Sequence, residues 1–393
     1  TVQGGEVTIA TVHTEGTGYQ TGDVVTIPKA NAGNTQVDPQ LTILTINSKA
    51  YLDSTNATDY DFLTIRDTSI VTNKTRVVKT KAAPAHTANN RGTLRIHLVE
   101  YSARYQVKIT PQGVAQQVVT VDTKAGDTAP SDADTTNFLN VNNILTTLNT
   151  GINNIQNISS SVVGTSIEIT SDNAFTIDYI TGGKGGESMT GYQDKVDSVS
   201  LLAGEANHGR TVEIINTASS SDSYFAKFVA NNGISGPGVW EETIAPGVSE
   251  GLKPDTMPHK LYNSAKNVFT FAPNDWVARL VGDDETNEHP MFAKTGDKTI
   301  QQAFYYNNRL GFLSDDNVEM SKSGEFFDFY MTTAQTAVDN DPIGISCSSI
   351  RPATLHGIIP TAQGLLLFSQ NQQFLMFSTE GNLTPSTALI RGL

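Results

Sequence analysis

The chain has 393 residues, a formal net charge of −14, 38% hydrophobic residues and 17% charged residues. This length allows roughly two or three domains with complete cores, because single cores stop growing near ~250–300 residues. The low charged fraction and the 32 glycines favour short strands joined by turns over long charged helices. The negative charge excludes tight general binding to nucleic acid unless a local basic patch overcomes it.

A single cysteine, Cys347, excludes internal disulfides and a zinc site built on cysteines. No apolar run approaches the ~20 residues that a membrane span needs, and the sequence does not open with a basic and then apolar signal segment. We therefore expect no membrane insertion by this chain and assembly in the cytoplasm.

Residues 1–48 are predicted to form a small glycine-rich β module, either an insert or the start of a fragment. The short runs VTIATV and VVTI are separated there by Gly16, Gly18 and Gly22. Residues 49–125 are predicted to form a β domain, because they contain the strand-like runs DFLTI, SIVTN, TRVVKT, LRIHLV and YQVKI.

This β domain is the most basic part of the chain, through Lys74, Arg76, Lys79, Lys81, Arg91 and Arg95. Lysine on an exposed strand also prevents edge-to-edge aggregation, and no aromatic side chains that could stack on bases are interleaved with these residues. We favour a solvated strand face over a phosphate contact.

Residues 126–195 are predicted to form an α+β subdomain with one amphipathic helix, which Asp134 or Thr135 is placed to cap. Its apolar residues recur at spacings of three and four: Phe138, Val141, Leu145, Leu148, Ile152 and Ile155. The runs TSIEIT and FTIDYI supply strands for it to pack on. The run GGKGGES at 182–188 lacks the spacing and context of a phosphate loop, so a flexible loop is predicted.

Residues 196–258 return to strands in TVEIIN, YFAKFVA and VWEETI and end in a link rich in proline and glycine. In the last segment, 259–393, apolar side chains alternate with smaller or polar ones at Phe304, Leu310, Phe312, Val318 and Met320. The pattern predicts two or three strands of a half-buried antiparallel meander. The turn formers at 314–317 and 321–324 are each expected to join one strand to the next.

Two runs of this segment, RLGFLSDDNVEMSKSG and GLLLFSQNQQFLMFSTEG, are faintly similar and start about 55 residues apart. Propeller blades repeat at ~40–50 residues, so a truncated β-propeller-like domain is predicted, with ordinary hairpin chemistry as the alternative. The predicted fold class is mainly β and multidomain, with short-strand β domains, one α+β subdomain and the first blades of a propeller-like unit.

The acidic loop at 283–288 is the best carboxylate cluster and could chelate a hard cation; its polar residues are Asp283, Asp284, Glu285, Asn287 and Glu288. It lacks the glycine and terminal glutamate of a calcium-binding helix–loop–helix, so a solvated turn is favoured. Glu241 and Glu242 are adjacent on a predicted strand, so they point to opposite faces and cannot act as an acid–base pair.

No pair of histidines has metal-ligand spacing; they are His13, His86, His97, His208, His259, His289 and His356. No serine lies in a GxSxG elbow. The sequence therefore predicts no catalytic, cofactor-binding or metal-ligating residue and no cofactor. Arg279 and Arg309 each lie within an apolar motif and need a partner. We favour a structural role, in which they bind backbone carbonyls or Asp341, over substrate binding.

Several motifs in a fixed order carry a family resemblance from about Tyr51 to the end, among them WVARLVGDDETN, FYYNNRLGFLSDDNVEMSKSGEFFDFY, TAQTAVDNDPIGI and LLLFSQNQQFLMFSTEGNLTP. The chain resembles the tail tubular protein B, or nozzle, family of short-tailed, podovirus-type bacteriophages. The resemblance implies a structural virion protein without enzymatic activity. It implies a homohexameric ring in the distal tail tube below a dodecameric tail adaptor, with tail fibres near the joint and double-stranded DNA passing through during ejection. It also implies further β-rich sequence after Leu393.

Two other classes of protein stay open from the residues. One is a carbohydrate-binding or depolymerising phage tail protein, which would need a groove with exposed aromatic side chains and, for hydrolysis, two carboxyl groups roughly 5–9.5 Å apart. The other is a free-standing propeller scaffold of cellular origin.

Overall fold

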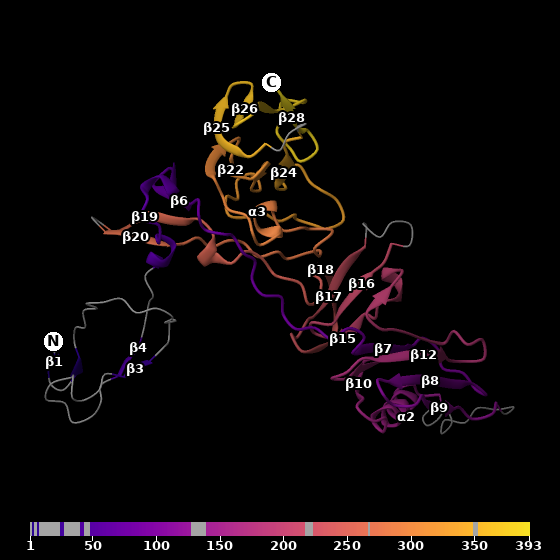
Figure 1. Ribbon diagram of the computed structural model, residues 1–393. Helices are drawn as coiled ribbons and strands as arrows, with labels where there is room; N and C mark the ends of the chain where they lie inside the picture. Colours follow the sequence, from indigo (N-terminus) through magenta and orange to yellow (C-terminus); the bar gives the residue numbers. More distant parts are fainter. Residues whose placement is uncertain are drawn as a thin grey trace. The chain divides into compact units, whose positions relative to one another are not determined.

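The computed structural model describes residues 2–3, 6–7, 24–26, 40–42, 48–126, 139–216, 223–265, 268–348 and 353–393. The chain divides into two compact units, one with Thr1–Arg76 and Pro254–Asn274 and the other with Val77–Lys253 and Asp275–Leu393. Many short strands in small sheets confirm the mainly β fold (Figure 1). The division into segments 1–48, 49–125, 126–195, 196–258 and 259–393 stays a prediction.

The first unit is built on an antiparallel sheet of four strands in the order β20-β19-β6-β5. The strands are β5 (Tyr60–Ile65), β6 (Thr68–Asn73), β19 (His259–Ala265) and β20 (Val268–Pro273), with the 3-10 helices η2 (Ser48–Tyr51), η3 (Ala57–Asp59) and η6 (Pro254–Thr256) beside them in the chain. The Asn73 backbone N–H donates to the Tyr51 hydroxyl at 3.0 Å. The Tyr51 ring stacks on His259 with centroids 4.1 Å apart, so η2 is fixed to the sheet.

Two small antiparallel pairs lie within residues 1–48: β1 (Val2–Gln3) with β2 (Glu6–Val7), and β3 (Val24–Thr26) with β4 (Gln40–Thr42). The predicted run VVTI corresponds to β3, whereas Gly16, Gly18 and Gly22 lie outside the described residues. The prediction of a strand at TRVVKT is wrong. Val77 and Thr80 make isolated bridges to Thr299 and Leu252, and partners on two separate segments cannot supply one continuous ladder.

The α+β part of the second unit has two antiparallel sheets. One has the order β10 (Ser159–Val163), β11 (Ser166–Thr170), β7 (Arg91–Ile96) and β13 (Met189–Tyr192), and the other β12 (Phe175–Thr181), β8 (Arg104–Pro111) and β9 (Gln117–Asp122). The helix α2 (Val141–Asn153) buries Leu145, Leu148 and Ile152 in a core with side chains of both sheets, which confirms the predicted amphipathic helix.

The predicted cap of α2 is wrong. The helix begins at Val141, and the Asn140 side chain accepts a hydrogen bond from the Asn142 backbone N–H at 2.9 Å. An N-cap must immediately precede the first helical residue to reach the free N–H groups of the first turn, which Asp134 and Thr135 do not. Those two residues lie outside the described part of the chain.

A sheet of five strands follows in the order β14 (Lys195–Val196), β16 (Thr211–Ile214), β17 (Tyr224–Ala230), β18 (Ser235–Thr243) and β15 (Glu205–Asn207). β14 pairs with β16 in parallel, and the other pairs are antiparallel. Trp240 packs edge-on against Phe228, and its indole N–H donates to the Ala203 carbonyl at 2.8 Å. The short 3-10 helix η4 (Val199–Leu201) lies between β14 and β15 in the chain.

The C-terminal part has two meanders of four antiparallel strands each. The first contains β21 (Gln302–Tyr306), β22 (Arg309–Ser314), β23 (Asn317–Met320) and β24 (Ile343–Ser346), and the second β25 (Leu355–Thr361), β26 (Gly364–Ser369), β27 (Gln373–Ser378) and β28 (Ala388–Gly392). One core contains Leu313 and Val318 of the first meander and Leu367 and Phe374 of the second. The two similar sequence runs thus each form one hairpin, β22–β23 and β26–β27.

The predicted half-buried pattern holds for β21, where Tyr305 is exposed, but it is wrong for β22 and β23, which are buried along their whole length. Leu313 and Val318 face the shared core, whereas Phe312 faces Trp276, Phe292 and Phe329. These aromatic residues come from segments before and after the two strands, including the short helix α3 (Met291–Lys294), and they cover the second face. Local periodicity could not show this second layer.

The prediction that residues 321–324 connect neighbouring strands is wrong, since β23 pairs with β24, which begins only at Ile343. The intervening residues supply Phe329 to the aromatic layer. Within the sheet, the Phe304 ring lies across Gly311, where an added Cβ would be 2.1 Å from it. Only glycine leaves room for that ring.

Candidate functional site

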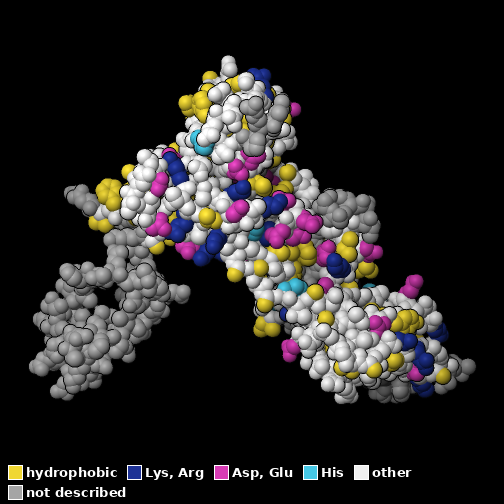
Figure 2. Space-filling model, viewed as in Figure 1, with side chains coloured by type: hydrophobic (Ala, Val, Ile, Leu, Met, Phe, Trp, Pro, Cys, Tyr) yellow, Lys and Arg dark blue, Asp and Glu magenta, His cyan; other side chains and the backbone are white. Residues whose placement is uncertain are grey.

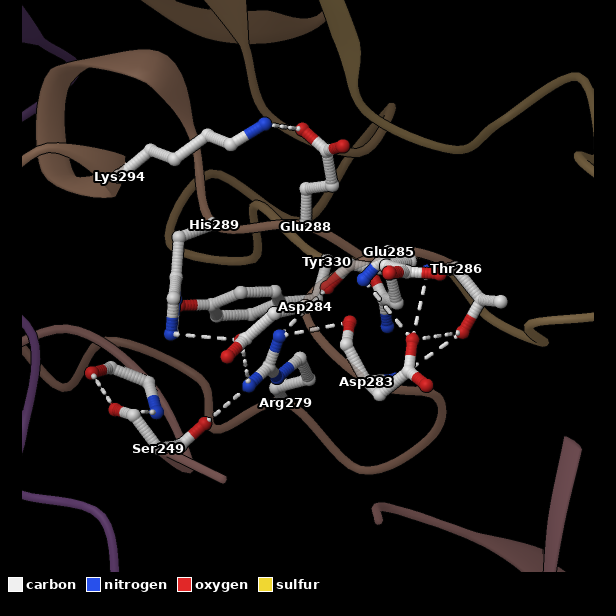
Figure 3. A network of polar contacts seen from close by, with 12 residues as sticks. Ser249, Arg279, Asp283, Asp284, Glu285, Thr286, Glu288, His289, Lys294 and Tyr330 are labelled. Atoms are coloured by element: carbon white, nitrogen blue, oxygen red, sulfur yellow. Dashed lines mark hydrogen bonds and ion pairs between the residues drawn. The ribbon is translucent and has the colours of Figure 1, made fainter. Parts of the chain in front are cut away.

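The acidic loop at 283–288 is organised around the fully buried side chain of Arg279 (Figure 3). One terminal nitrogen, Nη1, donates to the backbone carbonyls of Asp283 and Asn287 at 2.9 and 3.0 Å. The other, Nη2, donates to the Ser249 carbonyl at 2.7 Å and to the Asp284 carboxylate at 2.8 Å. The guanidinium therefore joins the loop to the segment around Ser249, and the prediction of backbone carbonyl partners is confirmed.

The Asp283 carboxylate closes the turn of the loop. It accepts hydrogen bonds from the backbone N–H groups of Glu285 and Thr286 at 3.0 and 2.9 Å and from the Thr286 hydroxyl at 2.9 Å. Burial would raise the pKa of this carboxyl, but these hydrogen bonds and nearby Arg279 hold it below its usual range. Asp283 is therefore ionised at neutral pH and bound to its own turn.

His289 and Tyr330 form the second part of the network. The His289 Nδ1 is 2.8 Å from the Tyr330 hydroxyl, and its Nε2 is 3.9 Å from the Asp284 carboxylate. Burial and the neighbouring Arg279 lower the pKa of His289 to about 4, so the imidazole is neutral at pH 7. Burial also raises the pKa of the Tyr330 hydroxyl, which stays protonated.

Three carboxylates of the acidic loop are bound to other groups of the protein. Asp283 is engaged by backbone donors, Asp284 by Arg279, and Glu288 by an ion pair with Lys294. Among the described residues, no three His, Cys, Asp or Glu side chains gather as a metal site. The contacts that the acidic loop makes hold together segments distant in sequence.

Arg309 acts in the same way in the first meander. Its guanidinium donates to the backbone carbonyls of Ser321, Asp339 and Asp341 at 2.7, 2.9 and 2.6 Å, with a further contact to Asn340. This confirms the predicted structural role. The Asp341 carboxylate instead accepts from the Thr332 hydroxyl and from the Thr332 and Val338 N–H groups.

Sequence reasoning missed three buried charged residues on β23 and in the segment that follows it. Glu319 on β23 accepts one hydrogen bond, from the Met291 backbone N–H at 3.1 Å, and burial raises the pKa of its carboxyl to about 7. Lys322 and Asp328 form a buried ion pair at 2.8 Å. A glutamate between Val318 and Met320 was a usable signal, because in a strand buried on both faces such a side chain must be buried as well.

A third buried arginine that sequence reasoning missed, Arg210, directly precedes β16 of the five-stranded sheet. Arg210 donates to the Gln193 and Thr211 carbonyls and lies 3.8 Å from the buried Glu168 carboxylate. Burial raises the pKa of Glu168, and Arg210 and the Thr93 hydroxyl partly offset this. No motif marks these residues, because their partners come from separate strands.

The adjacent residues Glu241 and Glu242 lie in different surroundings, as predicted for neighbours that point to opposite faces of a strand. Glu241 is exposed, whereas Glu242 accepts hydrogen bonds from the Thr333 hydroxyl at 2.6 Å and the Ala334 N–H at 2.7 Å. In the glycine-rich run, Lys184 N–H and the Ser188 hydroxyl both donate to the Glu100 carboxylate at 3.0 Å. A protein carboxylate therefore occupies the donors that a phosphate loop would offer to its ligand.

The basic residues of the predicted β domain belong to different units: Lys74 and Arg76 to the first, and Lys79, Lys81, Arg91 and Arg95 to the second. Arg76 pairs with Asp53 at 3.1 Å. Of the histidines, His259 and His289 are held in polar and ring contacts, and His13 lies outside the described residues. Across the described ranges, the longest helices are too short and too polar to span a bilayer.

Small sheets of short strands, joined by buried arginines that bind backbone carbonyls, define a mainly β protein. The sequence model of the family described as "Bacteriophage nozzle protein" matches residues 29–392, and the chain belongs to this family. It is therefore a structural component of the phage tail, and so of the virion, as the resemblance implied.

Among curated proteins, the chain is similar to tail tubular protein gp12 of Escherichia phage T7. The two are 27% identical over 352 residues, which cover 86% of this chain and 42% of the relative. The chain thus spans less than half the length of this relative.

Proposed function

We propose that the chain is a nozzle subunit whose copies close into a six-fold ring in the tail tube, and that DNA passes through this ring during ejection. The observation that carries the proposal is the family match across residues 29–392. The name of the T7 relative, a tail tubular protein, supports the same role. In this role the protein works as a part of a machine and needs neither catalysis nor a cofactor.

The polar networks support a role in which rigidity matters. Arg279 and Arg309 bind carbonyls of segments far apart in the sequence, and a buried guanidinium with several acceptors fixes their spacing. A sheet wall fixed in this way resists deformation when a polymer moves past it. The net charge of −14 supports passage without adhesion, because carboxylates facing the bore would repel phosphate.

The proposed partners are further copies of the chain, the tail adaptor, tail fibres and, transiently, double-stranded DNA. Head-to-tail closure of a ring needs two different complementary surfaces on each subunit. The two C-terminal meanders, each of four strands and sharing one core, support the proposal that they are blades of a β-propeller-like unit.

Electron microscopy of the purified full-length protein, alone and mixed with the tail adaptor of the same phage, tests the proposal. We expect rings with a central hole that stack on the adaptor. A particle that stays monomeric in both samples and releases reducing sugar from a host polysaccharide would contradict the proposal and favour the depolymerising alternative.

A further inference from the structure

Among the described residues, the sheet of the first unit has one edge strand on each side. Within the described part of the chain, β5 and β20 are its outermost strands, and neither has a second strand partner. An edge strand presents backbone N–H and carbonyl groups that can pair with another chain. Proteins usually protect such edges with charges, proline or a covering segment.

Each of these two edges carries an exposed phenylalanine. Phe62 on β5 is 64% exposed and Phe269 on β20 is 69% exposed, which ranks them among the most exposed large apolar side chains described. Exposed hydrophobic side chains are visible at the β19–β20 hairpin (Figure 2). Large apolar side chains on an open edge favour association over protection.

The strand register places both phenylalanines on the same face of the sheet. Phe62 lies opposite Val71, Val71 opposite His259, and His259 opposite Pro273. Directly opposite residues share a face, and so do residues two apart on one strand. Phe269 is four residues before Pro273 on β20, so its side chain projects from the face that carries Phe62.

The strand directions allow a head-to-tail contact between copies. All pairs in the sheet are antiparallel, so with four strands β5 and β20 run in opposite directions. When a second copy continues the sheet with the same face up, its β20 lies antiparallel beside β5 of the first copy. The ladder can then form, and Phe62 of one copy lies on the same face as Phe269 of the next.

We propose that β5 of one subunit pairs with β20 of a second copy of this chain, with Phe62 and Phe269 packed together. This contact rests on the proposed assembly into a ring and identifies the two complementary surfaces that it needs. A two-fold pairing of β5 with β5 would leave β20 and Phe269 uncovered, so the head-to-tail contact accounts for both edges and the two-fold pairing for one.

A charge exchange tests this pairing by native mass spectrometry and light scattering of the full-length chain. Phe62→Lys and Phe269→Glu should each weaken subunit association at least tenfold, because each places a charge against an apolar partner. The double variant F62K/F269E should regain most of the affinity through a Lys–Glu pair at every contact. Val118→Lys, which changes an exposed valine on the edge strand β9, is the matched control and should leave association unchanged.

Cross-linking provides a second readout. In a Cys347→Ser background, the pair F62C/F269C should give ladders of multimers with a short bismaleimide, and neither single cysteine should. Dimers from F62C alone would overturn the head-to-tail arrangement in favour of a two-fold contact. If all charge variants assemble like the unsubstituted protein, this interface is wrong while the ring proposal stands; a chain that is monomeric alone and with adaptor would overturn both.

Discussion

The β22–β23 hairpin and the β5 and β20 edges show two opposite uses of a short strand. β22 and β23 are buried on both faces and fixed by Arg309. β5 and β20 have large apolar side chains in solvent at the margin of their sheet. In the proposed assembly, β22–β23 give the subunit its rigidity, and β5 and β20 contact neighbouring copies. Substitutions should therefore reduce stability in the hairpin and association at the edges.

The largest effect is expected for Arg309→Ala, which leaves several buried carbonyls without a donor. We expect a loss of roughly 4 kcal/mol in the free energy of unfolding and a lower melting temperature. Arg391→Ala, at an exposed arginine of β28, is the control and should change the melting temperature little. An unchanged melting temperature for Arg309→Ala would show that Arg309 does not stabilise the β22–β23 hairpin.

Glu319→Gln should have the next largest effect, and its sign depends on pH. Burial raises the pKa of the Glu319 carboxyl to about 7 in the folded state, so ionisation of this carboxyl destabilises the fold. The contribution of the protonated carboxyl to the free energy of unfolding is fully present below the ordinary glutamate pKa of ~4.3. It is lost as the pH rises through about 7. Removing the charge should raise stability at pH 8 by roughly 3 kcal/mol.

Thermal melting between pH 5 and pH 8 measures this effect. The Glu319→Gln protein should lose less stability across this range than the unsubstituted protein, whereas Glu325→Gln, at an exposed glutamate, should follow the unsubstituted protein. If the stability of all three proteins changes with pH in the same way, burial does not raise the pKa of the Glu319 carboxyl.

Asp284→Ala should have a small effect, because the Asp284 side chain is 65% exposed and Arg279 retains its three carbonyl acceptors. The Arg279 side chain is buried but the Asp284 carboxylate faces water, so we expect a loss near the upper end of the ~0.2–1 kcal/mol of solvent-exposed pairs. Asp283→Ala removes the acceptor of the turn and should lower stability by about 1–2 kcal/mol. Equal losses in the two variants, measured by chemical denaturation, would contradict the distinction between the inner and outer carboxylates.

Phe62→Lys should have the smallest effect on folding. An exposed edge position away from polar networks changes the free energy of unfolding by less than ~0.5 kcal/mol. Circular dichroism melting of the isolated subunit measures it. A large drop would show that Phe62 stabilises its own sheet, and its effect on association would then need another cause.

The spacing of apolar residues along the chain predicted the strands and the helix that depend on neighbouring residues alone. The alternation from Phe304 to Met320 gave β21, β22 and β23, and the apolar spacing from Val141 to Ile152 gave α2. It could not give the second layer on Phe312, since Trp276 and Phe329 reach it from separate segments. The cap was misplaced because Asp134, Thr135 and Asn140 are all suitable cap residues and only the observed helix start separates them.

The arginine networks were predicted only in part. A guanidinium within an apolar motif must find acceptors, so carbonyl partners for Arg279 and Arg309 followed from chemistry. The particular carbonyls that the two arginines bind depend on where the chain reverses direction. No sequence pattern identifies Ser249 or Asp339 as an acceptor. Glu319 was missed because a half-buried strand would have left its carboxylate in water.

Hydrogen–deuterium exchange of the full-length chain, as isolated subunits and as assembled rings, distinguishes strands that are rigid within the subunit from strands that join subunits. We expect the amides of β22 and β23 to be protected in both states. The outward-facing amides of β5 and β20, which do not bond to β6 or β19, should become protected only on assembly. Fast exchange in β22–β23, or outward-facing amides of β5 and β20 that exchange equally fast before and after assembly, would contradict these two roles.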